Sequence, residues 1–136
     1  MANESLIVID THVLVWWLSG STRLSSRAKR RLAAACERKP AVASTISVLE
    51  IVTAERRGRL ELSVPVRQWL NNARALPELR FEPVTADIAQ LAGEFDETMH
   101  GDPADRLIAA TAACLNAPLV TADEKLRSYN KIKTLW

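Results

Sequence analysis

Short apolar runs alternate with longer amphipathic segments along the whole chain. Some runs are too short for helices, and the first is rich in β-branched residues, so they predict strands at 6–9, 41–43, 79–85, 119–121 and 131–136. Between them, apolar residues recur at helical spacing over 12–18, 25–39, 47–58, 64–76, 88–99, 102–115 and 124–128. This alternation predicts an α/β domain in which helices cover both faces of a small parallel sheet of about five strands.

Helix-start and helix-stop residues divide these segments. Ser47 and Glu50 have the spacing of a capping box, which predicts that the third helix begins at Ser47. Asp102 suits an N-cap and Pro103 suits the first helical position, which places Asp105 in the first turn, near the positive end of the helix dipole. A carboxylate is therefore expected at the start of a helix.

Length and composition fit one domain that spans residues 1–136. Hydrophobic residues make up 48% and charged residues 25% of the 136 positions, as in ordinary globular proteins. The formal net charge of +2 is too small to indicate nucleic-acid binding by itself. Cys36 and Cys114 lack metal-ligand spacing, and neither a signal peptide nor a membrane-length apolar run is visible. We therefore expect a cytoplasmic protein with no membrane partner.

Four carboxylates share one predicted edge of the sheet. Asp10 and Asp123 directly follow strands, and Glu50 and Asp105 lie in first turns of helices that leave the same edge. Ser or Thr would cap these helices equally well, so the acids need another cause. Two carboxylates about 5 Å apart repel by roughly 3 kcal/mol at an effective dielectric near 20, so a cation is expected among them.

The predicted ligands favour a hard cation. With only oxygen donors, and with no His or Cys expected beside them, Mg²⁺ or Mn²⁺ is the natural occupant. Such an ion lowers the pKa of a bound water and orients a phosphodiester, which predicts a hydrolytic nuclease. A capping role for each acid is the simpler alternative.

Four sequence blocks resemble, in order, those of a PIN-domain ribonuclease, and above all the VapC toxins of bacterial toxin–antitoxin pairs. The blocks are 8–17, 44–51, 100–111 and 119–123. The resemblance implies a Mg²⁺- or Mn²⁺-dependent endoribonuclease that cuts RNA, forms a homodimer and is inhibited by a VapB-like antitoxin. It also implies that the catalytic and metal-holding residues are Asp10, Glu50, Asp105 and Asp123.

Auxiliary positions follow from the same resemblance. Thr11 and Thr121 match hydroxyls near the metal, and Ser47 matches a small polar residue one turn before Glu50. Asp102 matches an additional acid, although capping is expected to be its main role. We expect Arg106 to pair with a nearby carboxylate, with a substrate phosphate as the second choice.

Other residues remain open between structural and functional roles. His12 and His100 are not assigned to catalysis, and Trp16, Trp17 and Ile51 either form a groove for the antitoxin or belong to the core. A metal-dependent phosphatase and a non-catalytic PIN-like module are the rival functions. A phosphatase usually has a second acid two residues after its aspartyl nucleophile, where this chain has His12 after Asp10. An assay of metal-dependent RNA cleavage, run in parallel with hydrolysis of a small phosphomonoester, distinguishes the nuclease, the phosphatase and the non-catalytic module.

Overall fold

The computed structural model describes residues 6–136, which form a five-stranded parallel sheet covered by helices. The strands run in the order β3-β2-β1-β4-β5, so β1 lies at the centre. Their bounds are Val8–Ile9 (β1), Ala41–Ser44 (β2), Leu79–Glu82 (β3), Leu119–Val120 (β4) and Thr134–Leu135 (β5). Every neighbouring pair is parallel, which confirms the predicted α/β class and the C-terminal edge strand.

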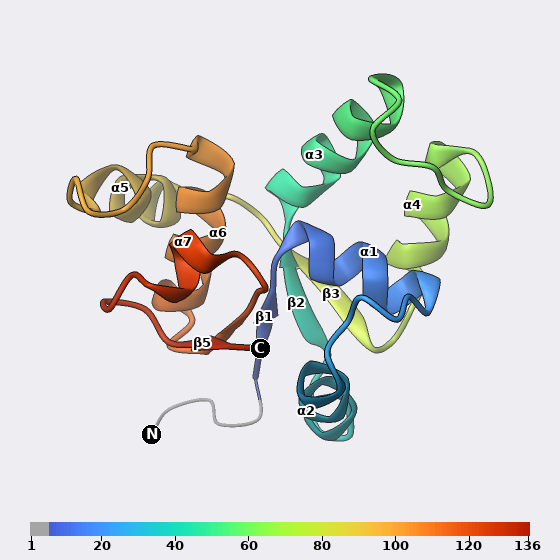
Figure 1. The fold of residues 1–136 in the computed structure, drawn as a ribbon, viewed down its shortest axis with the longest axis horizontal. Helices are drawn as coiled ribbons and strands as arrows, with labels where there is room; N and C mark the ends of the chain where they lie inside the picture. Colours follow the sequence, from blue (N-terminus) through green and yellow to red (C-terminus); the bar gives the residue numbers. More distant parts are fainter. Residues whose placement is uncertain (1–5) are drawn as a thin grey trace.

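Seven helices connect these strands within the described part of the chain. They are Thr11–Ser19 (α1), Ser26–Cys36 (α2), Thr45–Arg56 (α3), Val66–Arg74 (α4), Ala86–Glu94 (α5), Pro103–Cys114 (α6) and Glu124–Arg127 (α7). In Figure 1, α1 to α4 lie on the right of β1, whereas α5, α6 and α7 lie on the left. None of the helices within residues 6–136 is long and apolar enough to cross a membrane.

Side chains of β1 point alternately into two separate cores, as expected for a strand buried on both faces. Ile7 and Ile9 pack in the core that includes buried residues of α1, α2 and α4. Val8 packs in the other core, with buried residues of α6 and α7. The continuous apolar run of the sequence therefore reflects a strand covered on both sides by helices.

Strand order reverses at β1, because the chain goes first to β2 on one side and returns to β4 on the other. In open parallel sheets a crevice forms at such a point, outside the carboxyl ends of the strands. Asp10 and Thr121 directly follow the two strands that flank this point. The topology therefore places the first and last acidic blocks of the sequence side by side.

Several predicted boundaries are wrong by two or more residues, and two of these errors bear on the site. The third helix begins at Thr45 rather than Ser47, because the Ser44 hydroxyl caps it by accepting from the Ile46 amide at 3.1 Å. Ser47 lies inside the helix and is fully buried. The helix predicted over 88–99 ends at Glu94, since Phe95 has an extended backbone and begins a loop that continues to Asp102.

Candidate metal centre

A cleft of about 680 Å³ lies at the carboxyl end of the sheet. Its lining includes the four predicted acids and Asp102, contributed by the ends of β1 and β4 and by α3 and α6: Asp10, Glu50, Asp102, Asp105 and Asp123. No Lys or Arg within residues 6–136 forms an ion pair with any of them. The fold therefore gathers negative charge that the described basic side chains do not neutralise.

Asp10 is the most buried acid of the cleft, at 6% exposure. Its Oδ1 accepts from the Val13 amide at 2.9 Å, which caps α1, and its Oδ2 accepts from the Thr121 hydroxyl. Burial raises the pKa of Asp10, although these hydrogen bonds oppose the rise. The Thr121 hydroxyl also accepts from the Asp123 amide at 3.1 Å, so one side chain holds two acidic positions together.

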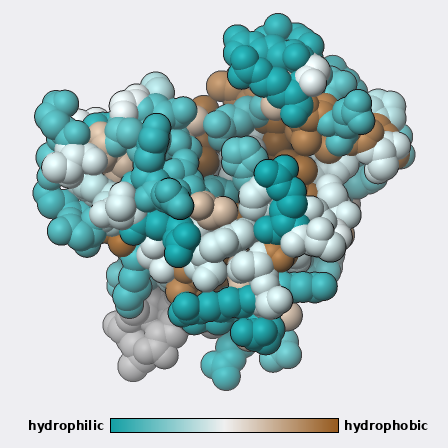
Figure 2. Space-filling view, in the orientation of Figure 1, coloured by the Kyte–Doolittle hydropathy of each residue, from teal (hydrophilic) through white to brown (hydrophobic). Residues whose placement is uncertain are grey.

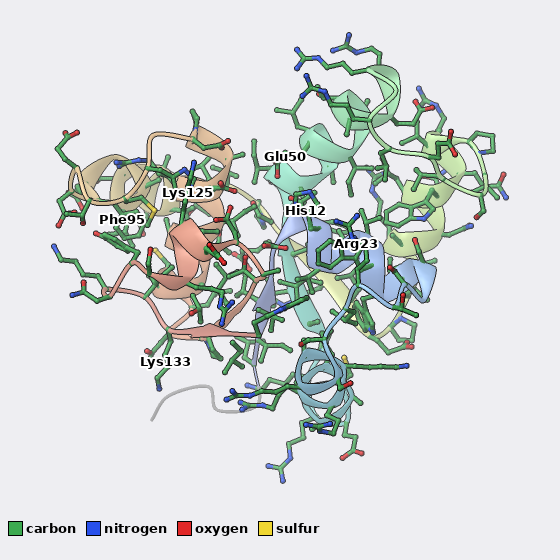
Figure 3. All side chains as sticks on the ribbon, viewed as in Figure 1. His12, Arg23, Glu50, Phe95, Lys125 and Lys133 are labelled. Carbon is green, nitrogen blue, oxygen red and sulfur yellow. The ribbon has the colours of Figure 1, made fainter. Side chains whose placement is uncertain are left out.

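Glu50 is held by a chain of two hydroxyls. The Thr11 hydroxyl donates to Glu50 Oε1 and lies 2.7 Å from the Ser47 hydroxyl. Because a hydroxyl has one proton, Thr11 uses its own on Glu50 and accepts the proton of Ser47. Burial also raises the pKa of Glu50, and the neighbouring Asp102 adds to the rise. In Figure 3, Glu50 lies on the side of α3 that faces α6 and α7.

Asp105 has a carboxyl group with a strongly raised pKa. Burial, followed by the negative charges of Asp102, Asp123, Glu50 and Asp10, raises its pKa to about 7. Asp102 accepts from the Asp105 amide at 3.1 Å and therefore caps α6 as predicted. Asp123 likewise caps α7, where its Oδ1 accepts from the Lys125 amide at 2.8 Å.

A histidine that was not assigned from sequence belongs to the same cluster. One ligand atom each of His100, Asp105 and Asp123 lies within 4.8 Å of the others. The expectation that only oxygen donors surround the site is therefore wrong, because the loop before α6 places His100 beside the carboxylates. Two carboxylates and an imidazole suit a divalent metal, so this donor set is suited to hold such an ion.

Arg106 does not pair with a carboxylate, and this expectation is also wrong. Its guanidinium donates five hydrogen bonds to carbonyl oxygens of the loop and of the end of α5, at 2.9 to 3.2 Å: those of Ala92, Phe95, Asp96, Met99 and His100. A guanidinium has five N–H donors, so all of them are occupied. Arg106 therefore holds the backbone of the loop and has no donor left for a substrate phosphate.

Basic and apolar side chains line the other end of the cleft. Arg23, Arg57 and Arg59 contribute positive charge that the sequence analysis did not connect with the site. Trp16 also lines the cleft, with the Arg23 guanidinium 4.9 Å from its ring centre, and Figure 3 labels Arg23 near His12. These residues follow no common motif, so only their positions in the fold reveal the grouping.

The apolar wall of the cleft agrees only in part with the predicted groove. Ile51 lines the cleft but is 1% exposed and belongs to the core, whereas Leu49, another lining residue, is 60% exposed. Trp16 lines the cleft, and Trp17 packs partly buried against the core. Figure 2 shows hydrophobic residues at the surface between α3 and α4.

Comparison with known proteins gives consistent matches over nearly the whole chain. A family model described as "PIN domain" matches residues 7–132. Ribonuclease VapC22 of Mycobacterium tuberculosis is 36% identical over 132 residues, which cover 96% of this chain and 98% of that protein.

Solved structures show the same fold at lower identity. VapBC2 of Rickettsia felis, bound to a DNA fragment from its promoter, matches with a TM-score of 0.70 and 16% identity over 96% of this chain and 97% of that one. VapC20 of M. tuberculosis, a toxin that cleaves the sarcin–ricin loop, matches with a TM-score of 0.65 and 19% identity over 91% and 95%.

Proposed function

The chain belongs to the PIN domain family, and we propose that it is a metal-dependent endoribonuclease that acts as the toxin of a type II toxin–antitoxin pair. One observation carries the proposal: five carboxylates without a described Lys or Arg partner converge in one cleft. The relation to a protein named Ribonuclease VapC22 supports RNA as the substrate.

Asp10, Glu50, Asp105 and Asp123 would hold Mg²⁺ or Mn²⁺. A divalent cation supplies a water of lowered pKa and positive charge near the scissile phosphate. Thr121 and Thr11 fix the carboxylates of Asp10 and Glu50 through their hydroxyls, so these oxygens keep their positions when the charges of the site change. We assign Thr11, Ser47 and Thr121 to positioning for this reason.

The basic end of the cleft is suited to bind the RNA strand on either side of the phosphodiester that is cut. Guanidinium groups match phosphate oxygens in bidentate geometry, and Arg23, Arg57 and Arg59 line the same cleft as the acids. A chain of phosphates could therefore extend from these arginines to the acidic end. Because electrostatic contacts of this kind weaken with salt, RNA binding is expected to weaken as salt is raised.

A VapB-like antitoxin is the proposed partner. The acidic end would accept an arginine of the antitoxin, and the exposed Leu49 beside Trp16 would contact an apolar segment of it. The family resemblance also implies a homodimer, which sedimentation velocity of the purified chain would test.

RNA cleavage by the purified chain tests the activity. We expect cleavage with Mg²⁺ or Mn²⁺, none with a chelator, and none of a small phosphomonoester. Asp10→Asn and Asp123→Asn should abolish cleavage, whereas Asp87→Asn, which changes an exposed first-turn acid of α5 outside the cleft, should not. Hydrolysis of the phosphomonoester without cleavage of RNA would show that the chain is a phosphatase instead.

A further inference from the structure

His100 lies in the loop between α5 and α6, with its side chain turned into the acidic cluster. The side chain is 19% exposed, and its Nε2 atom is buried without a hydrogen-bond partner. This atom lies 3.3 Å from Asp105 Oδ2, yet the two groups lack the geometry of a hydrogen bond. The contact is therefore close but is not a hydrogen-bonded ion pair.

A divalent cation would account for this contact. The Nε2 atom is buried without a hydrogen-bond partner and lies 3.3 Å from Asp105 Oδ2, so its lone pair can bind an ion that the carboxylates also hold. A metal ion that binds both atoms needs no hydrogen bond between them.

The spacing of the donors suits one small ion. The ligand atoms of His100, Asp105 and Asp123 lie within 4.8 Å of one another. Opposite ligands of an octahedral ion with bonds near 2.1 Å are about 4.2 Å apart, and adjacent ones about 3 Å. The three side chains therefore surround a volume of nearly the right size.

Arg106 fixes the backbone that carries the imidazole. Its Nε donates to the His100 carbonyl at 3.0 Å, and its other four donors hold carbonyls from Ala92 to Met99. Asp105 precedes Arg106 in the first turn of α6. The same helix turn therefore positions both the nitrogen donor and one of the oxygen donors.

We propose that His100 Nε2 is a nitrogen ligand of a divalent ion shared with Asp105 and Asp123, so that this centre selects Mn²⁺ over Mg²⁺. The preference follows from ligand chemistry, because imidazole suits first-row transition ions, whereas Mg²⁺ prefers oxygen donors. The inference rests on the proposed function in that it concerns the same site, but metal binding can be measured without RNA.

Pulsed electron paramagnetic resonance of the protein with one equivalent of Mn²⁺ tests the ligand directly. Nitrogen-14 coupling from a coordinated imidazole is expected in the wild type, prepared without a histidine tag. The chain has only 2 His, so His12→Gln is the matched control for His100→Gln. We expect the coupling to persist in His12→Gln and to vanish in His100→Gln.

Titration calorimetry with MnCl₂ and MgCl₂ gives the selectivity. His100→Gln should weaken Mn²⁺ binding at least about tenfold and Mg²⁺ binding by less than about threefold. Absence of nitrogen coupling in the wild type, or its loss in His12→Gln instead, would overturn the inference even if His100→Gln failed to fold.

The two proposals fail separately. RNA cleavage with Mg²⁺ by a wild type that shows no nitrogen coupling would remove the role of His100 and leave the nuclease intact. Nitrogen coupling in a protein that cuts no RNA would support the ligand and refute the nuclease.

Discussion

Asp105 is the cleft residue whose pKa is raised by the charges of four neighbouring carboxylates. Its pKa of about 7 in the folded protein, against 3.8 for the free side chain, means that the folded state retains a proton that the unfolded chain has lost between these values. The free energy of unfolding of the metal-free protein must therefore fall as pH rises from about 4 to about 7. The raised pKa values of Asp10 and Glu50 act in the same direction.

Asp105→Asn should remove the contribution of Asp105 to the pH dependence of the free energy of unfolding. We expect thermal unfolding in chelator to show a variant that is more stable than the wild type, by a margin that grows from pH 5 to pH 8. The variant should lose RNA cleavage by more than roughly 100-fold, because even groups that only support a metal ligand change activity 10- to 100-fold. Cleavage at the wild-type rate, or a stability difference independent of pH, would contradict the assignment.

Asp102 has a different role at the same helix start. Its carboxylate accepts from the Asp105 amide, which a serine hydroxyl can also do. Asp102→Ala should therefore lower the free energy of unfolding by about 1 kcal/mol, whereas Asp102→Ser should retain both stability and most activity. If Asp102→Ser lost as much RNA cleavage as Asp105→Asn, Asp102 would be a metal ligand.

Individual acids were predictable from sequence, but two of their neighbours were not. Asp10, Asp102 and Asp123 can be identified from sequence because they follow predicted strands or begin predicted helices. In the structure each of them is an N-cap. His100 lies in a loop without a periodic pattern. The five acceptors of Arg106 are backbone carbonyls, which look alike at every position of a sequence.

Among the elements, α6 and the loop before it form one unit that depends on Arg106. Arg106→Lys should lower the free energy of unfolding by about 2–3 kcal/mol, since lysine cannot satisfy five carbonyls at fixed directions and each hydrogen bond contributes about 1 kcal/mol. Urea denaturation followed by circular dichroism would measure this. Arg74→Lys, at an exposed position of α4, is the matched control. A change in the free energy of unfolding below about 0.5 kcal/mol would show that the loop keeps its conformation without the hydrogen bonds of Arg106.

Helix starts illustrate how sequence-based prediction can go wrong by a single turn. Ser44, Thr45 and Ser47 all suit an N-cap, and the Ser47–Glu50 spacing favoured the last of them. The structure instead continues β2 up to Ser44, and Ser47 turns inward to Thr11 on α1. The Ser47 hydroxyl, which the capping-box spacing assigned to an N-cap, thus contributes to the contact between α1 and α3.

For the whole molecule, the cleft joins an acidic end to a basic and apolar one. An antitoxin arginine at the acidic end would compete with the metal for the same carboxylates. We therefore expect inhibition of RNA cleavage by the cognate antitoxin to weaken as Mg²⁺ is raised. Replacing that arginine by Ala should remove the Mg²⁺ dependence but leave binding through Leu49 and Trp16. If the native antitoxin and its Ala variant inhibited RNA cleavage equally at every Mg²⁺ concentration, this competition would be excluded.

The central position of β1 also determines how late in translation the cleft can form. The Thr121 hydroxyl and Asp10 that it holds are 111 positions apart, and β4 and β5 are the last strands to be synthesised. A nascent chain still inside the ribosomal exit tunnel at Leu119 has no β4 beside β1 and no Asp123. We expect arrested chains to gain protease resistance only when residues through Leu135 have left the tunnel; resistance at shorter lengths would contradict this. The acidic cleft is thus among the last features of the described chain that can form during synthesis.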